Sequence, residues 1–198
     1  MCAAPGLELP PRSFFLASSP DLARRLLGCV LTSETPGGLC SGIIVETEAY
    51  TRDDPASHSR MGPTARNRPM FEGGGLAYVY FVYGMHCCFN VTSGGPGDGE
   101  AVLVRALEPL EGLDAMMQRR GTREIRLLAS GPGRLCAAMG IGLGISGTDL
   151  SAGPVRVLVR AQGLPPRSIA SSARIGVRAA ADRPWRFYVR DSPFLSRR

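Results

Sequence analysis

The sequence contains no lysine, so all 23 of its basic side chains are arginine. Any mechanism that needs a lysine Schiff base with a sugar aldehyde is therefore excluded, which leaves only the terminal amine for that chemistry. A GC-rich genome would favour arginine throughout, but arginine also binds phosphates and base edges through its planar set of donors. The 17 acidic residues leave a net charge of +6, which is compatible with a polyanionic partner.

Metal-binding motifs and long apolar runs are also lacking. The six cysteines form no Cys-x-x-Cys pair and only two histidines accompany them, so we expect buried free thiols rather than a zinc site. No apolar run approaches the roughly 20 residues that span a bilayer, and the N-terminus has no secretory pattern. These absences predict an intracellular, soluble protein with neither a metal nor a cofactor.

The 198 residues predict a flexible, Pro-rich arm at 1–12 and one domain at 13–198. Apolar alternation predicts strands at 29–35, 41–50, 76–82, 86–93, 101–107, 155–159 and 185–189, the first two joined by a turn at 36–38. Helices are expected at 19–28, 110–120 and 130–139. The fold class is therefore α+β, with a single mixed, mostly antiparallel sheet, flanking helices and a protruding hairpin.

Two carboxylates stand on one predicted strand. Because side chains alternate along a strand, Glu46, Glu48 and Tyr50 share one face with Ile44, whereas the opposite face has an ordinary core pattern. The Cα atoms of the two acids are roughly 6.5–7 Å apart, a spacing that admits a two-carboxylate glycosidase. An exposed strand edge whose acids balance arginines explains the same pattern, and the spacing alone leaves both interpretations open.

Aromatic residues follow the hairpin predicted around residue 84. Tyr78 and Tyr80 share a face on which either ring could stack against a ligand. Tyr83, beside Gly84 at the tip, suits a wedge that enters a base stack. Because tyrosine is also a good strand former, sideways packing of these rings is the alternative.

Three further polar residues are candidates for a binding pocket: two lie within apolar strands and one lies in a long loop. Arg105 lies within the apolar strand 101–107, where a buried guanidinium needs a partner. Asn90 is a similar polar residue in the strand 86–93, and the two together suggest the lining of a pocket. His58 follows two acids in the long loop 51–75 and is either a pocket residue or a solvated one.

These motifs together resemble the alkyladenine (3-methyladenine) DNA glycosylases. The likeness runs in the same order from about residue 12 to the end of the chain. It is carried by the segments 44–50, 58–60, 66–68, 78–80, 83–85, 105–112, 130–132 and 186–189.

The resemblance implies a role for each matching residue of the reaction centre. Glu48 falls where the family has the general base that activates water, and Arg105 where an arginine helps to order the flipped nucleotide and its water. Tyr50 and Tyr80 fall where aromatic rings enclose the extruded base, with His58 completing that pocket.

The remaining matches concern specificity and DNA binding. Asn90 matches a residue that discriminates against the exocyclic amino group of guanine. Tyr83 matches the residue that replaces the flipped nucleotide in the duplex, with Met85 beside it. The candidates for contacts with the DNA backbone are Arg60, Arg66, Arg68 and Arg134.

The resemblance implies a monofunctional glycosylase of base excision repair, with a fold like the C-terminal domain of formyltransferases. We expect it to act, as a monomer and without a cofactor, on 3-methyladenine, 7-methylguanine, hypoxanthine or ethenoadenine in duplex DNA. Its location would be cytoplasmic and nucleoid-associated in a bacterium, or nuclear in a eukaryote. The alternatives are a non-catalytic nucleic-acid-binding module on that fold and, less favoured, a carbohydrate hydrolase using Glu46 and Glu48.

Overall fold

The structure, a computed structural model, describes residues 6–35, 37–160, 168–177 and 179–197. Its strands are β1 (Leu7–Glu8), β2 (Val30–Thr35), β3 (Gly38–Tyr50), β4 (Ala77–Val82), β5 (His86–Ser93), β6 (Glu100–Glu111), β7 (Val155–Arg160), β8 (Ile169–Ser172) and β9 (Arg186–Val189). Its helices are α1 (Ser19–Leu26), α2 (Leu113–Arg120), α3 (Ile125–Leu128) and α4 (Pro132–Met139), with 3₁₀ turns at Arg12–Leu16, Arg68–Phe71 and Leu143–Ile145. None of these helices is long and apolar enough to cross a membrane.

One nine-stranded sheet organises the chain, in the order β1-β7-β2-β3-β6-β5-β4. The long strand β3 pairs along one edge with β6, and along the other with β2 and then with β9, which itself pairs with β8. Every strand pairing among the described residues is antiparallel. The α+β prediction with a mostly antiparallel sheet is therefore confirmed.

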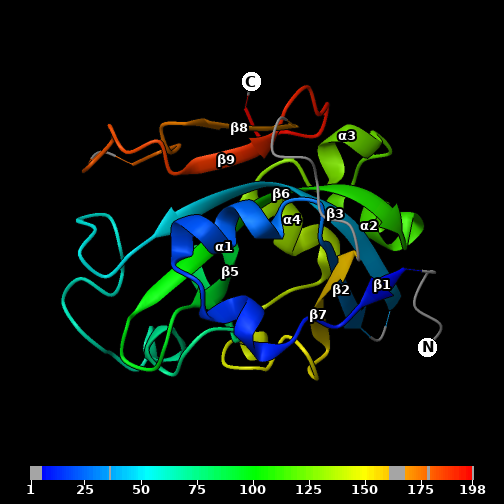
Figure 1. Ribbon diagram of the computed structural model, residues 1–198. Coiled ribbons are helices and arrows are strands. Elements are labelled where there is room, and N and C mark those ends of the chain that lie inside the picture. The colour runs from blue at the N-terminus through cyan, green and yellow to red at the C-terminus, as the bar shows by residue number, and fades with distance from the viewer. Residues whose placement is uncertain (1–5, 36, 161–167, 178, 198) are drawn as a thin grey trace.

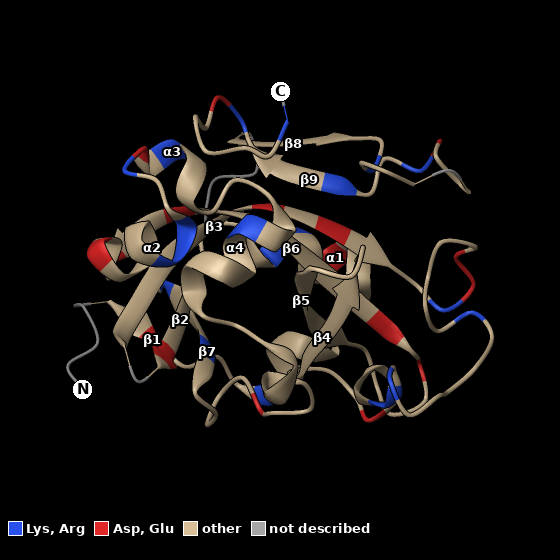
Figure 2. Cartoon of the chain, turned by 180° about the vertical axis from the view of Figure 1, so that it is seen from behind, with Lys and Arg blue, Asp and Glu red and all other residues tan. Residues whose placement is uncertain are grey.

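Helices cover both faces of this sheet. Helix α1 lies in front of it in Figure 1, whereas α2 and α4 lie in front of it in the reversed view of Figure 2. Leu22 and Leu26 of α1 and Leu135 and Met139 of α4 are fully buried and belong to the main hydrophobic core. The core thus fixes β3, β5 and β6 from both sides, and these are the strands that carry the polar residues of the site.

Helix α1 begins as the sequence predicts, with a proline and an acid in its first turn. Ser18 is the N-cap residue, and the helix ends at Leu26, two residues before the predicted end, where Gly28 has a left-handed backbone (φ 84°). The Thr47 hydroxyl of β3 donates to the Ala23 carbonyl of this helix at 2.9 Å. This bond confirms that the Thr47 face of β3 is turned towards the helix.

The cysteines of the described residues are free thiols, as expected. Cys29, Cys40, Cys88 and Cys136 are buried and Cys87 is half-buried, while Cys2 lies outside the described residues.

The ends of several elements differ from the prediction. The helix expected at 110–120 begins only at Leu113, because β6 continues to Glu111 and there pairs with Ser41 of β3. The short elements α3, β1 and β8 have no clear sequence pattern and were not predicted. Residues 1–5 of the expected arm and Pro36 of the expected turn lie outside the described residues, but Leu7–Glu8 pair with β7.

Gly112 marks the change from β6 to α2, and its backbone is left-handed (φ 77°). A Cβ at this position would lie 2.4 Å from the Leu39 carbonyl oxygen and 2.7 Å from Cys40 Sγ. The close approach to a backbone atom cannot be relieved by rotating a side chain. Glycine is therefore required here both for its dihedral angles and for its size.

We expect Gly112→Ala to lower the free energy of unfolding by about 3 kcal/mol, because it combines left-handed strain with overpacking. Gly121→Ala is the matched control: its backbone is also left-handed (φ 64°), but its Cβ would meet nothing within 4 Å. That variant should lose only about 1 kcal/mol. Urea denaturation measures both, and equal losses would contradict the steric argument.

Candidate active site

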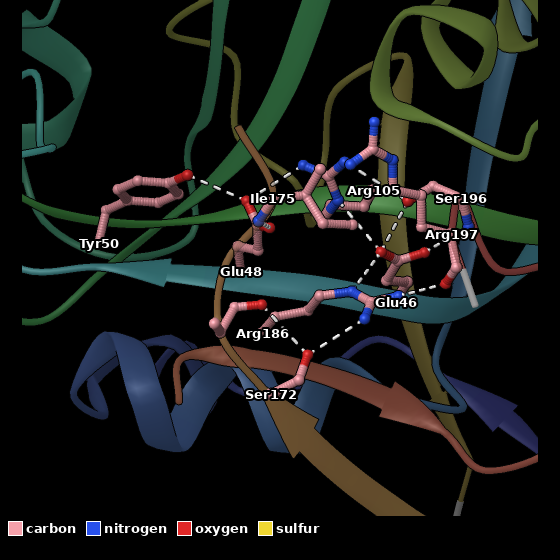
Figure 3. A network of polar contacts seen from close by, with 10 residues as sticks. Glu46, Glu48, Tyr50, Arg105, Ser172, Ile175, Arg186, Ser196 and Arg197 are labelled. Carbon is pink, nitrogen blue, oxygen red and sulfur yellow. Dashed lines mark hydrogen bonds and ion pairs between the residues drawn. The ribbon is translucent and has the colours of Figure 1, made fainter. Parts of the chain in front are cut away.

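Glu46 is held by donors from three parts of the chain and is completely buried. Its carboxylate accepts hydrogen bonds from Arg105 Nε of β6 (3.1 Å) and from Arg186 Nε of β9 (2.8 Å). The Ser196 backbone N–H (2.6 Å) and hydroxyl (2.7 Å) donate to it as well. Figure 3 shows these four donors converging on one side chain. Glu46 therefore has little acceptor capacity left for a substrate or a water molecule.

Glu48 is also completely buried, but its partners are different. Its Oε2 atom accepts from the Tyr50 hydroxyl (3.0 Å) and from Arg105 Nη1 (3.1 Å), and its Oε1 atom accepts from the Ile175 backbone N–H (2.7 Å) (Figure 3). Arg105 thus joins both acids. The β3–β6 register is irregular on both sides of Glu46, next to the position of Arg105.

The charges of this network are set by burial and by their mutual attraction. Burial raises the pKa of Glu48, although Arg105, the Ile175 amide and the Tyr50 hydroxyl all act to lower it. Burial favours the neutral form of Arg105, but the charges of Glu48 and Glu46 outweigh it, so the Arg105 pKa is raised. A carboxylate with a raised pKa beside a permanent cation is suited to accepting a proton.

A pocket of about 350 Å³ is lined by Tyr50, whose hydroxyl donates to Glu48, whereas Glu48 itself is not part of the pocket wall. Its wall consists of Tyr50, His58, Tyr78, Tyr80, Asn90, Met70 and Ala101, together with residues 56–57 and 176, 177 and 179. The wall thus combines side chains of β3, β4, β5 and β6 with residues of the loops that follow β3 and β8.

Three rings of the pocket hold one another in place. The ring centroids of His58 and Tyr80 are 4.4 Å apart and nearly perpendicular, and those of Tyr78 and Tyr80 are 5.4 Å apart. The Nδ1 atom of His58 is 2.8 Å from the Tyr78 hydroxyl oxygen. Asn90 donates through Nδ2 to the Tyr78 carbonyl at 3.0 Å, so its amide is held rigidly at the wall. Fixed groups of this kind can select a ligand by shape.

Histidine 58 is half-buried rather than solvated. Burial lowers its pKa, and the nearby positive charge of Arg66 lowers it further. A lowered pKa keeps the imidazole neutral at pH 7, so one ring nitrogen can accept a hydrogen bond and the other can donate one.

Apolar side chains project from the tip of the β4–β5 hairpin. Tyr83 is 89% exposed and Met85 is 69% exposed, and Phe81 is exposed next to them. Tyr83 has a positive φ of 52°, which is uncommon for a residue other than glycine. Neither strand of this hairpin contains a charged residue, as Figure 2 shows. An exposed aromatic group on strained backbone indicates a contact surface rather than core packing.

The four arginines proposed for DNA contacts differ in their surroundings, although all are exposed. Arg60 and Arg66 lie in the loop that carries His58. Arg68 Nε pairs with Glu72 at 2.7 Å, and Arg134 of α4 donates to the Ser130 hydroxyl at 3.3 Å. Within the described part of the chain, no three His, Cys, Asp or Glu side chains gather where they could hold a metal ion.

Comparison with known proteins agrees with this geometry. The model of the methylpurine-DNA glycosylase (MPG) family matches residues 13–193. A relative from Methanoculleus marisnigri, named "Putative 3-methyladenine DNA glycosylase", is 49% identical over 190 residues, which are 95% of this chain and 98% of the relative. Relatives of the same name from Rubrobacter xylanophilus (54% identical, 83% of this chain and 85% of the relative) and Carboxydothermus hydrogenoformans (43% identical, 96% and 100%) also match.

The chain belongs to the methylpurine-DNA glycosylase family. It is a hydrolase of the DNA-3-methyladenine glycosylase type, which acts on alkylated purines in damaged DNA. The resemblance read from the sequence is confirmed. The non-catalytic binding module and the carbohydrate hydrolase are set aside by the same finding.

The structure brings most of the predicted pocket residues together. Tyr50, His58, Tyr80 and Asn90 line the pocket, whereas Arg105 lies behind it and contacts the two acids. Ile44, expected on the face of the site, is buried in the hydrophobic core.

Some residues of the site escaped the sequence reasoning. Arg186 and the Ile175 amide bind the acids from positions more than 120 residues away along the chain. The only signal for Arg186 was the segment 186–189 shared with the family.

We expect His58 to titrate below its ordinary pKa of 6.5, and Arg66→Met to raise that pKa because a nearby positive charge is removed. Arg68→Met is the control, since the Arg68 guanidinium is paired with Glu72. Measuring the imidazole resonance by NMR against pH tests both variants. A His58 pKa that does not respond to Arg66→Met would contradict this electrostatic account.

Proposed function

We propose that this glycosylase extrudes a damaged purine from duplex DNA into the aromatic pocket and hydrolyses its N-glycosidic bond with Glu48 as general base. The substrates are 3-methyladenine and, beyond it, 7-methylguanine, hypoxanthine or ethenoadenine. The observation that carries this proposal is a buried carboxylate with a raised pKa, hydrogen-bonded to a tyrosine of the pocket wall. The enzyme acts as a monomer on chromosomal DNA, in the nucleoid of a bacterium or the nucleus of a eukaryote.

Recognition of the base follows from the pocket wall. A volume of about 350 Å³ is at the small end of the range for ligand sites, as suits a single base. Stacking on aromatic rings contributes roughly 1–3 kcal/mol per base, which offsets the few kcal/mol needed to unstack it. Purines alkylated at N3 or N7 carry a positive charge, and the faces of Tyr50 and Tyr80 favour that charge through cation–π attraction. The rigid Asn90 amide disfavours the exocyclic amino group of undamaged guanine, which lacks the compensating positive charge of 7-methylguanine.

The chemical step uses the carboxylate of Glu48. As the bond between C1′ and the purine nitrogen breaks, the base leaves with the bonding electrons and the sugar gains oxocarbenium character. Glu48 takes a proton from a water molecule while the water oxygen bonds to C1′. Arg105 holds the carboxylate, and its charge stabilises the ionised form. Because the chain has no lysine, the product is an abasic site without strand cleavage.

The exposed tip of the β4–β5 hairpin provides the wedge. Tyr83, with Met85 beside it, enters the duplex in place of the extruded nucleotide and prevents its return. The exposed arginines Arg60, Arg66, Arg68 and Arg134 contact the phosphates, which fixes the position of the duplex without reading its sequence.

We expect Glu48→Gln to reduce excision from methylated duplex DNA by at least about 100-fold, because glutamine cannot accept the proton of water. Its affinity for damaged duplex should remain, since the pocket wall and the hairpin are unchanged. Single-turnover release of methylpurines and a binding titration measure the two quantities. Glu34→Gln is the control, since that exposed carboxylate lies on β2 and pairs with Arg156. Near-normal excision by Glu48→Gln would show that another group is the base.

Replacement of Tyr83 by alanine should slow excision from duplex DNA by roughly 10- to 100-fold, because the gap in the base stack is left unfilled. Excision from single-stranded DNA of the same sequence should be almost unchanged, since no stack has to be opened. Comparing the two substrates with one enzyme preparation controls for loss of active protein. An equal loss on both substrates would argue against a wedge.

A further inference from the structure

A second buried ion pair lies behind the pocket wall and is not part of the Glu46–Glu48 network. It joins Arg174, two residues beyond β8, to Asp54 in the loop that follows β3, and both side chains are completely buried. Arg174 binds both carboxylate oxygens, Nη1 to Oδ2 and Nη2 to Oδ1, the second at 3.0 Å. Nothing in the chemical step described above uses this pair.

The guanidinium of Arg174 also holds the strand and the ring that carry the site. Its Nη1 atom donates to the Ala49 carbonyl at 3.0 Å, next to Tyr50 in the chain. Its Cζ atom lies 4.6 Å from the centre of the Tyr50 ring and 5.5 Å from that of Trp185. Arg174 itself does not line the pocket, whereas Tyr50 does. The cation therefore packs against Tyr50 from outside the pocket and fixes the plane of the ring.

Both residues of the pair are close in the chain to groups of the active site. The residue after Arg174 is Ile175, whose amide donates to Glu48 Oε1 at 2.7 Å, and Gly176 follows in the pocket wall. On the other side, Asp54 Oδ1 accepts from the Ala56 amide at 3.0 Å, and Ala56 lies in the wall two residues before His58. The pair thus connects the two loops of the pocket.

We propose that Arg174 and Asp54 form a positioning pair, which sets the Tyr50 ring and the Ile175 amide and thereby the stacking surface and the orientation of Glu48. The inference rests on the proposed function of Glu48. It assigns neither residue a contact with the substrate. Stability alone does not require such a pair, because apolar residues of similar size often replace a buried ion pair at no net cost.

The decisive experiment separates positioning from folding by comparing two single variants with their double variant. Arg174→Met or Asp54→Asn alone leaves one buried group without its partner, which should lower the Tm by roughly 10 °C. The double variant leaves no unpaired buried charge, so its Tm should return most of the way to the wild-type value. Its excision of methylpurines from duplex DNA should nevertheless stay roughly 10- to 100-fold below wild type, because the ring and the amide remain unfixed.

The pH dependence of single-turnover excision is the second measurement. The Ile175 amide lowers the pKa of Glu48, so its displacement in the double variant should move the acid limb of the profile to higher pH. Displacement of the Tyr50 hydroxyl acts in the same direction, because this group also lowers the pKa of Glu48. The remaining groups that face Glu48 are unchanged in this variant: Arg105, Glu46 and the thiol of Cys88. A purely structural role for the pair would leave the acid limb in place.

Arg24→Met is the matched control, because it also removes an arginine stacked on a ring. The Arg24 Cζ atom lies 4.2 Å from the centre of the Phe187 ring, but Arg24 belongs to α1 and does not line the aromatic pocket. Excision and its acid limb should stay at wild-type values in this variant. A loss equal to that of the double variant would overturn the proposal.

The outcomes distinguish this inference from the proposed function. If the double variant recovers excision together with its Tm, or keeps the wild-type acid limb, the pair supports only the fold and the inference is wrong. If Glu48→Gln retains excision, the proposed base is wrong and the positioning role falls with it. Inactive Glu48→Gln combined with a fully active double variant would refute the positioning role alone.

Discussion

The two hydrogen bonds from Arg105 to Glu46 and Glu48 are the interaction on which the site depends. Removing one charged group from water costs several kcal/mol, and here two carboxylates are buried on the same strand. Their mutual repulsion would drive one of them to the neutral form if no cation stood between them. Arg105 bridges both acids from the adjacent strand, and Arg186 adds the second positive charge at Glu46. The four side chains therefore have balanced formal charges inside the sheet.

The two acids of this network differ in their hydrogen-bond partners. Glu46 accepts four hydrogen bonds, among them two from Ser196 near the C-terminus, and so joins the end of the chain to the centre of the sheet. Glu48 has three partners, and one of them is the hydroxyl of a ring in the pocket wall. Glu48, with fewer fixed donors and a bond to a ring of the pocket wall, is therefore the acid to which the proposed mechanism gives the proton transfer.

Strand periodicity explains why much of this site could be predicted from the sequence. Alternation placed Glu48 and Tyr50 on one face, and they do form a hydrogen bond. Alternation cannot predict partners from distant segments, such as Arg186 and the Ile175 amide. Their positions depend on how β9 and the loop after β8 pack against β3, which no local pattern encodes. The same limit applies to the helix start at Leu113, which is set by the β3–β6 register and not by local propensity.

Charge balance at the acids has a consequence for substrate selection. Since two carboxylates face two guanidinium groups, the network offers a cationic base no net negative charge. In the proposed mechanism, selection of a positively charged purine then comes from the ring faces of the pocket, where cation–π attraction and ordinary stacking act together. Stacking alone still holds a neutral purine, though more weakly. Under the proposed function, a pocket built from tyrosines and a neutral histidine therefore favours cationic lesions without requiring the charge, which leaves the carboxylate of Glu48 to act on the water at the sugar carbon.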